Sequence, residues 1–375
     1  MKERFDMGQE TRDEQGPDAR HETRDEQRSD ARHETRDEQG PDMRRETRDA
    51  SNVSRLTSPE GGDAALATRS CTVVTAGDRA FAWGTLLLVA SMRRNGMAHP
   101  VVVGAMGWTP EQKSRVLALG GVSIRDLPPS RQCVTCQKPL LMDLDEIGTD
   151  WVCWADSDGA FVGDCSEWLV GENPDEIVVR KYDPPPEDFT PATLETWRRD
   201  VEKHCGAARP ESRYPTRANA PFIVVHRKWR PFLKRWRDQI AAVLPADVDI
   251  IMKHGSPYFQ TDESVLGSLL CFDPDAPAVV PVYKPNGSAD RNRYYAHFAW
   301  NPKPWQMWNS HSLKWRPVVA PVVRWLLDRG VVRPGDLPRP LRDSWWPLCR
   351  AAAPLAPWVW RGVKLRRKLA KGLKR

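Results

Sequence analysis

The chain has 375 residues, which exceeds one average domain but suits a single catalytic core with appendages. The first 50 residues carry 11 Lys and Arg against 16 Asp and Glu, whereas the rest of the chain is basic. The charged start differs from a signal peptide, and no apolar run approaches the roughly 20 residues of a membrane span, so we expect a cytoplasmic protein.

The N-terminal region is repetitive. Residues 9–44 contain three copies of a twelve-residue unit, QETRDEQGPDAR, HETRDEQRSDAR and HETRDEQGPDMR. The unit has almost no apolar side chains, so stacked copies would bury no core and a solenoid is excluded. A stretch with Ser, Gly and Pro follows. We therefore expect residues 1–68 to be a disordered charged tail and linker.

From residue 69 onward, strand and helix patterns alternate. The pattern predicts strands at residues 71–76, 100–105, 122–124 and 151–155, and helices at residues 78–94, 110–120 and 139–147. Thr109, Pro110 and Gln112 form the start signal of the second helix. This order predicts an α/β fold with a doubly wound, mainly parallel twisted sheet flanked by helices. In such a sheet, ligands bind at the carboxyl ends of the strands.

Two acidic residues follow the predicted strand at residues 151–155. Asp156 and Asp158 lie at positions i and i+2, so an extended backbone points both side chains to one side. Carboxylates are hard oxygen ligands suited to Mg²⁺ or Mn²⁺, which in turn neutralise a diphosphate. Asp-x-Asp-Gly is also common in ordinary turns, so a turn without a metal is the alternative.

Five pieces of sequence occur in an order that resembles the family 8 glycosyltransferases, the group of bacterial lipopolysaccharide galactosyl- and glucosyltransferases and glycogenin. They are VTAGDRAF, the strand ending in DSD, NAPFIVVHRKWR, TDESVL and HFAWNPKPW, and the likeness covers roughly residues 71–308. The most specific piece is His297-Phe298 followed by Lys303-Pro304-Trp305, similar to the family's His-x-x-Gly-x-x-Lys-Pro-Trp.

The resemblance implies a GT-A nucleotide-sugar-binding domain, which we place at residues 69–310, that transfers a hexose from a UDP-sugar with retention of configuration. It implies that Asp156, Asp158 and His297 bind Mn²⁺ (or Mg²⁺) and that Lys303 adds positive charge at the phosphates. The chemistry of the residues agrees, because two carboxylates and an imidazole leave coordination positions open for phosphate oxygens.

Further residues match the family's nucleotide site. Thr75, Ala76 and Asp78 stand where the family holds uracil and ribose, although Asp78 could instead cap the following helix. Lys138 is placed where a basic residue could reach the sugar or phosphate, although lysine is also common on protein surfaces that have no binding role.

The candidates around the sugar are Asn219, Asp262 and Glu263. A carboxylate beneath an anomeric carbon can stabilise an oxocarbenium-like transition state or attack that carbon. The alternative is a purely structural role, in which Asp262 and Glu263 cap a helix. The chain departs from the family pattern at three positions: Pro221 and Trp300 replace Gly, and Glu263 replaces Gln. The loop around Trp300 must therefore run differently, or the phosphate site is altered.

Residues 311–375 form a basic, Trp-rich extension. Nine of the 17 Trp lie between residues 300 and 360, and eight Lys or Arg but no acid follow Trp360. Val363, Leu365, Leu369 and Leu373 recur at roughly helical spacing. Such a helix can lie in an anionic membrane interface. Nucleic acid would attract the same charge, but the interfacial Trp favours the membrane, so we expect peripheral binding to the inner face of the cell membrane.

Other functions use similar sequence features. Phosphatases of the haloacid dehalogenase type also carry Asp-x-Asp, but they resemble a pattern with Thr or Val where this chain has Ala160. A calcium loop beginning at Asp156 would require Gly at the position of Phe161. Cys133-x-x-Cys136 could be half of a zinc site, but no second close pair completes it, and eight cysteines indicate no disulfide framework here.

The sequence thus predicts a metal-dependent hexosyltransferase that acts on a glycan or lipid-linked acceptor in cell-surface polysaccharide or lipopolysaccharide synthesis. The alternative is a degenerate, non-catalytic sugar-binding or membrane scaffold, which Pro221 and Trp300 keep open.

Overall fold

The structure is a computed structural model that describes residues 70–128, 132–181, 185–186, 188–248, 251–253, 255–281 and 295–372. The chain divides into two units, Met1–Pro59 and Glu60–Arg375, and all described residues belong to the second. The predicted tail at residues 1–68 and Leu373 of the predicted C-terminal helix lie outside the described residues.

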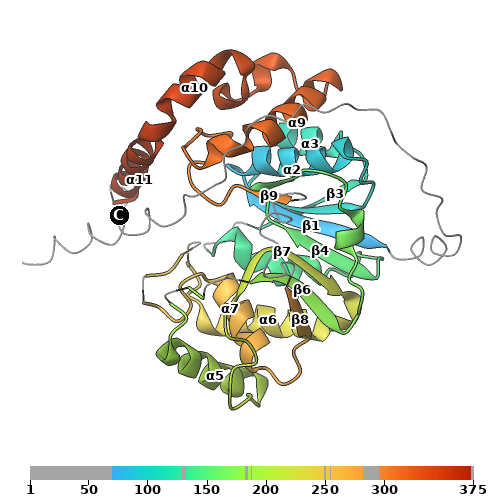
Figure 1. Ribbon diagram of the computed structural model, residues 1–375, viewed down its shortest axis with the longest axis vertical. Helices are drawn as coiled ribbons and strands as arrows, with labels where there is room; N and C mark the ends of the chain where they lie inside the picture. The colour runs from blue at the N-terminus through green and yellow to red at the C-terminus, as the bar shows by residue number, and fades with distance from the viewer. Residues whose placement is uncertain are drawn as a thin grey trace, which may run out of the picture. The chain divides into compact units, whose positions relative to one another are not determined.

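A seven-stranded sheet forms the centre of the second unit, with the strand order β3-β2-β1-β4-β7-β6-β8 (Figure 1). Its strands are β1 Cys71–Asp78, β2 Val101–Met106, β3 Val122–Leu127, β4 Trp151–Ala155, β6 Glu176–Lys181, β7 Ala218–His226 and β8 Ala278–Pro281. Only β7 runs antiparallel to its neighbours in this sheet. The predicted α/β fold with a mainly parallel sheet is confirmed. A separate two-stranded sheet pairs β5 Gly159–Phe161 with β9 Tyr295–His297.

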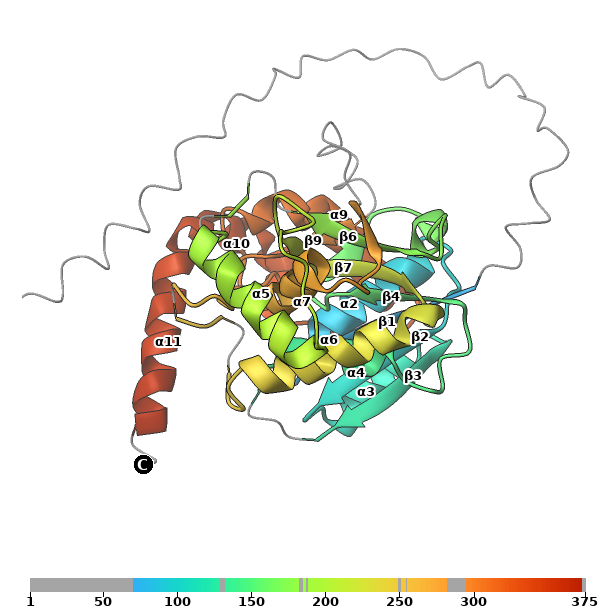
Figure 2. The ribbon, with the colours of Figure 1, turned by 90° about the horizontal axis from the view of Figure 1, so that it is seen from below.

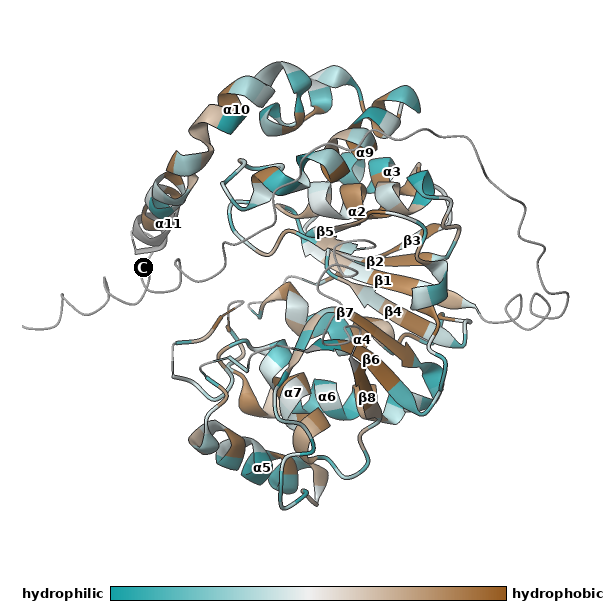
Figure 3. Cartoon of the chain, viewed as in Figure 1, coloured by the Kyte–Doolittle hydropathy of each residue, from teal (hydrophilic) through white to brown (hydrophobic). Residues whose placement is uncertain are grey.

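Helices cover both faces of the main sheet (Figures 1 and 2). One face packs against α2 Ala82–Arg94, α3 Pro110–Leu117 and α9 Arg316–Asp328, and the other against α4 Lys138–Met142, α5 Pro191–Cys205, α6 Arg230–Val243 and α7 Asp262–Phe272. Each face has its own apolar cluster, and neighbouring strand residues alternate between the two, as Val73 and Val74 do. The central parallel strands β2 and β4 are accordingly hydrophobic along their length, as parallel strands buried on both faces are (Figure 3).

Local signals place the helix ends. The predicted capping box is present, because the Thr109 side chain accepts from the backbone N–H of Gln112 and the Gln112 side chain accepts from that of Thr109. Gly96 follows α2 with a φ of +80°, a left-handed conformation that glycine adopts without strain.

Several predicted boundaries are wrong. β1 extends to Asp78 instead of ending at residue 76, α2 begins at Ala82 instead of residue 78, and α3 ends at Leu117 instead of residue 120. The third strand extends to Leu127 instead of ending at residue 124. The helix predicted at residues 139–147 ends at Met142, because Arg230 of α6 binds both the carboxylate and the carbonyl of Asp143 at that end. A contact between residues 87 positions apart is invisible to local sequence patterns.

The start of the C-terminal extension belongs to the same core as the sheet. Val319, Val322, Val323 and Leu326 of α9 are buried in the apolar cluster that contains α2. The predicted domain division after residue 310 stays a prediction. Beyond α9 the chain continues into α10 Trp346–Ala352 and α11 Ala356–Gly372. Within the described ranges, no helix is both long and apolar enough to cross a bilayer.

Short 3-10 turns connect these elements. They are η1 Val134–Gln137, η2 Ser166–Leu169, η3 Arg227–Trp229, η4 Ser312–Trp315, η5 Pro334–Asp336, η6 Arg339–Leu341, η7 Asp343–Trp345 and η8 Ala353–Leu355. The turn η1 leads directly into α4 beneath the site described next.

Candidate active site

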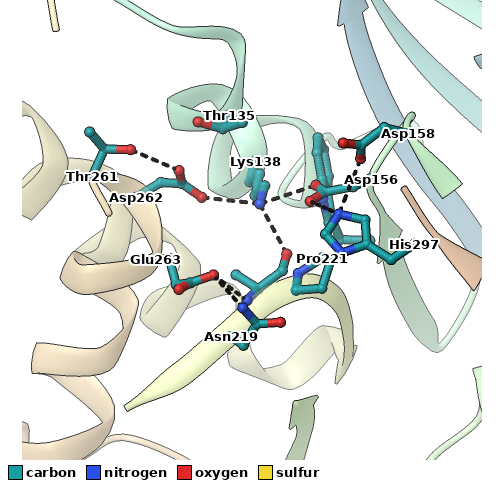
Figure 4. A network of polar contacts seen from close by, with 12 residues as sticks. Thr135, Lys138, Asp156, Asp158, Asn219, Pro221, Thr261, Asp262, Glu263 and His297 are labelled. Carbon is teal, nitrogen blue, oxygen red and sulfur yellow. Dashed lines mark hydrogen bonds and ion pairs between the residues drawn. The ribbon is translucent and has the colours of Figure 1, made fainter. Parts of the chain in front are cut away.

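The antiparallel direction of β7 brings two distant segments together at one edge of the sheet. Ala155, the last residue of β4, pairs with Phe222 in the middle of β7. The backbone N–H of Asp156 then donates to the carbonyl of Pro221 at 2.9 Å. The carboxyl end of β4 therefore lies beside the amino end of β7, which carries Asn219 (Figure 4).

The small second sheet adds a histidine to this edge. Gly159 pairs with His297, so the imidazole reaches the two aspartates that precede β5. The Nε2 atom of His297 lies 3.3 Å from Oδ1 of Asp158 and 3.9 Å from Oδ2 of Asp156. Single ligand atoms of these three side chains lie within 4.8 Å of one another, so the group could hold a metal ion. No other such cluster occurs among the residues that the structure describes.

Two buried lysines occupy the remaining carboxylate oxygens. The Nζ of Lys138 lies 3.2 Å from Oδ1 of Asp156, which also accepts from the indole N–H of Trp154 at 2.7 Å. The Nζ of Lys303 lies 2.7 Å from Oδ2 of Asp158. Each aspartate therefore directs one oxygen to a lysine and the other toward His297.

This charge arrangement shifts two pKa values. Burial favours the neutral form of Asp158, but Lys303 and His297 outweigh it and hold the pKa of that carboxyl well below its usual range. Burial likewise works to lower the pKa of Lys138, and the carboxylates of Asp156 and Asp262 overcome it and raise that pKa above its usual value. The buried groups are thus held in their charged forms.

The loop after β9 accommodates Trp300 by exposing it. The Trp300 ring is 64% exposed and stacks on His311 with a centroid distance of 5.0 Å. The carbonyls of Phe298 and Ala299 accept from the Nζ of Lys303 at 2.6 and 3.0 Å. These contacts orient the carbonyls of the loop toward Lys303, which is 3% exposed.

The opposite side of the site is built by β7 and the start of α7. Oε2 of Glu263 accepts from Nδ2 of Asn219 at 3.1 Å and from the backbone N–H of Ala220 at 3.0 Å. Oδ2 of Asp262 lies 3.1 Å from the Nζ of Lys138, which also donates to the Ala220 carbonyl at 2.9 Å. Lys138 therefore connects both sides of the site (Figure 4).

The start of α7 is also strained. Thr261, immediately before it, has a φ of +46° although it is β-branched and fully buried. Its hydroxyl lies 3.2 Å from Oδ1 of Asp262, which fixes the acidic pair in place. Strain of this kind persists only where the surroundings enforce it, and it occurs often at functional sites.

The predicted nucleotide residues lie at the end of β1. Thr75 and Ala76 are buried within the strand, and Asp78 is its last residue. The alternative role of Asp78 was to cap the following helix, but Asp78 does not cap α2. Its Oδ1 accepts from the N–H groups of Ala80 and Phe81, and α2 begins only at Ala82 without a side-chain cap.

This strand end lies against the aspartate loop. A methyl group on Gly77 would approach Oγ of Ser157 to 3.4 Å, and one on Gly84 would clash with the carbonyl of Ser157 at 2.3 Å. The Trp305 ring would meet the same Gly84 methyl at 2.5 Å, so the loop, α2 and the Lys-Pro-Trp segment pack closely together. The structure thus brings the residues of the predicted nucleotide and metal sites to one edge.

Three residues that shape the site were not predicted from the sequence. Trp154 stands two positions before Asp156, so strand periodicity alone could have indicated its contact with that carboxylate. The hydroxyl of Tyr295 donates to the Asp156 carbonyl at 2.9 Å, across 139 positions, and no local signal indicates this. Arg217 pairs with Asp188 and lies 3.7 Å from Oε1 of Glu263.

Comparison with known proteins identifies similar structures. No family model matches the chain, and no curated protein matches its sequence. A solved structure of the WbbM bifunctional glycosyltransferase is similar over 73% of this chain and 52% of that chain, at 16% identity and a TM-score of 0.45. Galactosyltransferase LgtC in complex with donor and acceptor sugar analogs matches over 73% of this chain and 98% of that one, at 13% identity and a TM-score of 0.43.

The glycosyltransferase GlyE of Streptococcus pneumoniae TIGR4 matches over 70% of this chain and 64% of that chain, at 14% identity and a TM-score of 0.41. The chain thus spans about half the length of WbbM. All three proteins are glycosyltransferases, the class of enzyme whose motifs the sequence resembles.

Proposed function

We propose that the chain is a metal-dependent hexosyltransferase that moves a sugar from a UDP-sugar to a glycan or lipid-linked acceptor, with retention of configuration, in cell-surface polysaccharide or lipopolysaccharide synthesis. The observation that carries this proposal is the convergence of Asp156, Asp158 and His297 at the carboxyl end of β4. In mainly parallel sheets, this edge is where phosphate-bearing ligands bind.

The donor set fits a divalent ion. Two carboxylate oxygens and one imidazole nitrogen suit Mn²⁺, and they suit Mg²⁺ less well because it rarely takes nitrogen ligands. In octahedral coordination with bonds of about 2.1 Å, adjacent ligand atoms are roughly 3 Å apart. The 3.3 Å between His297 and Asp158 is close to that spacing, whereas the 3.9 Å between His297 and Asp156 is roughly 1 Å wider. An ion held by these residues would supply Lewis-acid stabilisation of a departing diphosphate.

The protein's own residues would prepare the site for that charge. Lys138 and Lys303 orient Asp156 and Asp158, and burial of both ammonium groups keeps water from competing for the carboxylates. Lys303 lies next to Asp158, so its positive charge would also act on phosphate oxygens at this edge. Thr75, Ala76 and Asp78 at the end of β1 would meet the uridine.

The residues across the site would meet the sugar. Glu263 holds the side chain of Asn219 and the backbone of Ala220 in fixed positions. Its charge would stabilise the positive charge that develops at the anomeric carbon, and Asn219 would orient the sugar. Asp262 would act through Lys138, which it holds against Asp156.

Calorimetric titration of UDP into the full-length protein, with and without Mn²⁺, tests the proposal. We expect binding only with Mn²⁺, and we expect Asp156→Asn to abolish it while circular dichroism shows an unchanged fold. Screening UDP-sugars for Mn²⁺-dependent transfer would follow. A folded protein that binds no UDP under either condition would contradict the proposal and favour a non-catalytic scaffold.

We also infer that the C-terminal helices bind an anionic membrane surface, where lipid-linked acceptors are found. Large apolar side chains of these helices are exposed, namely Leu348, Leu355, Trp358, Val359 and Leu365. The guanidinium of Arg361 lies over the Trp358 ring at 5.1 Å, which pairs a basic group with an exposed aromatic one. Interfacial helices combine apolar and basic side chains in this way.

A further inference from the structure

A pair of cysteines lies at the turn that leads into α4. Cys133 precedes η1 and Cys136 lies within it, and their sulfur atoms are only 3.2 Å apart. Cys133 is partly exposed, whereas Cys136 is 3% exposed. The zinc hypothesis gains no support, because neither cysteine belongs to a cluster of three potential metal ligands among the described residues.

The two thiols differ in acidity. The sulfur atoms of Cys133 and Cys136 lie within hydrogen-bonding distance, and this contact, together with the Thr135 hydroxyl, lowers the pKa of Cys133 to about 7 despite its burial. The same interaction raises the pKa of Cys136 well above its usual value. Cys133 is therefore the nucleophile of the pair at neutral pH, and Cys136 is placed to resolve a mixed disulfide.

The other six cysteines lack these properties. Burial raises the pKa of each of them, namely Cys71, Cys153, Cys165, Cys205, Cys271 and Cys349. The partly exposed Cys205 has its pKa raised to about 11, which makes it a matched unreactive thiol. Reactivity toward oxidants should therefore be confined to the pair at η1.

The pair is connected to the candidate active site through one short helical segment. Lys138 follows Cys136 by two residues at the start of α4, and Figure 4 shows Thr135 of η1 beside it. A disulfide requires the sulfur atoms at about 2.05 Å, so closing the present gap brings the two sulfur atoms roughly 1 Å closer. Lys138 makes three contacts of 2.9 to 3.2 Å, with Ala220, Asp262 and Asp156, and any movement of η1 that accompanies closure is transmitted to these contacts through the two residues that separate Cys136 from Lys138.

We propose that Cys133 and Cys136 form a reversible redox modification site, oxidised by low-molecular-weight disulfides such as oxidised glutathione, and that its oxidation displaces Lys138. The Cys133 thiol first loses its proton, the thiolate attacks one sulfur of the small disulfide, and the departing sulfur takes up that proton and leaves as a thiol. Cys136 then attacks the sulfur of Cys133 and releases the second thiol, with both protons passing to the departing thiols. The protein loses two electrons and two protons, and the small disulfide gains them.

Mass spectrometry of the full-length protein tests the modification itself. After exposure to oxidised glutathione, we expect a peptide with an internal Cys133–Cys136 disulfide that dithiothreitol reverses. In the reduced protein, iodoacetamide should alkylate Cys133 at least about tenfold faster than Cys205 at neutral pH, with a rate that rises through about pH 7. In Cys136→Ser, Cys133 should instead retain glutathione as a mixed disulfide, whereas Cys205→Ser should behave as wild type. Absence of the internal disulfide in the wild-type protein would overturn the proposal.

The displacement of Lys138 has its own readouts. Amide hydrogen exchange of residues 138–142 should be faster in the oxidised protein, and this readout does not depend on any activity. Mn²⁺-dependent UDP affinity, which rests on the proposed function, should fall about fivefold on oxidation in wild type and stay constant in Cys133→Ser. Unchanged exchange in fully oxidised protein would overturn the coupling. A reduced protein that binds no UDP would contradict the proposed function and leave the exchange result to decide the coupling.

Discussion

The two sides of the site use their carboxylates differently. On the β4 side, Asp156 and Asp158 each give one oxygen to a lysine and present the other to His297. On the α7 side, hydrogen-bond donors and Lys138 occupy Asp262, and Asn219 and Ala220 donate to one oxygen of Glu263. Aspartate oxygens that face each other across a histidine can bind a cation. Carboxylate oxygens that already accept from N–H groups instead hold the donor residues in position.

The difference shows how acidic residues can share one small site. Four carboxylates near one another would repel, and each would be costly to bury without a partner. The basic side chains of Lys138, Lys303 and Arg217 separate them into two groups with different tasks. Lys138 belongs to both groups, so its removal should disturb both sides of the site and have the largest effect.

Lys138→Met should cost about 3 to 5 kcal/mol of unfolding free energy, because it leaves the carboxylates of Asp156 and Asp262 without their shared cation. Urea unfolding measures this loss. Lys113→Met is the matched control, since Lys113 pairs with Asp126 at the surface and should contribute less than about 1 kcal/mol. Equal losses in the two variants would mean that Lys138 does not hold the two sides together.

His297→Ala tests the β4 side alone. The change removes one candidate ligand without leaving a lysine unpaired, so Mn²⁺-dependent UDP affinity should fall about 100-fold while the unfolding free energy changes by less than about 1 kcal/mol. Calorimetry and urea unfolding give the two values. His204→Ala, at an exposed position near the end of α5, should change neither. Retained affinity in His297→Ala would remove the histidine from the metal site.

Glu263→Gln tests the α7 side. A glutamine can still accept from Asn219 and Ala220 through its amide oxygen, but it carries no charge near the sugar. Mn²⁺-dependent UDP affinity should change by less than about twofold, and kcat for transfer should fall about tenfold. Glu202→Gln in α5, which pairs with Arg198 at the surface, is the control. A loss of UDP affinity equal to that of His297→Ala would show that the two sides do not have separate tasks.

The β4 side was more predictable from sequence than its partners. Asp156 and Asp158 follow an apolar strand with clear boundaries, and their i, i+2 spacing is a local property. The contact with His297 depends on β5 and β9, which are three residues each and too short to show a periodic pattern. Only the family resemblance indicated that histidine.

The α7 side depends on the direction of β7, which no local pattern encodes. Because β7 runs antiparallel to β4, its first residues meet the start of α7 rather than the far edge of the sheet. Sequence analysis named Asn219, Asp262 and Glu263 but could not show that Glu263 holds Asn219. The same limit applied to Lys138, whose partners come from β4, β7 and α7.

A change in the C-terminal helices should not alter UDP binding at either side of the site. Trp358→Ala tests this and has the smallest expected effect of these variants. The Trp358 side chain is 68% exposed, so its removal should weaken binding to anionic phospholipid vesicles by about 1 kcal/mol, or roughly fivefold, and leave Mn²⁺-dependent UDP affinity unchanged. Vesicle co-sedimentation measures the first quantity, and zwitterionic vesicles should bind neither protein strongly. Trp168→Ala, at a tryptophan that is 37% exposed outside these helices, should bind vesicles as wild type does. Equal vesicle binding by wild type and Trp358→Ala would show that the Trp358 side chain does not insert into the membrane interface, because an inserted indole would contribute to the affinity.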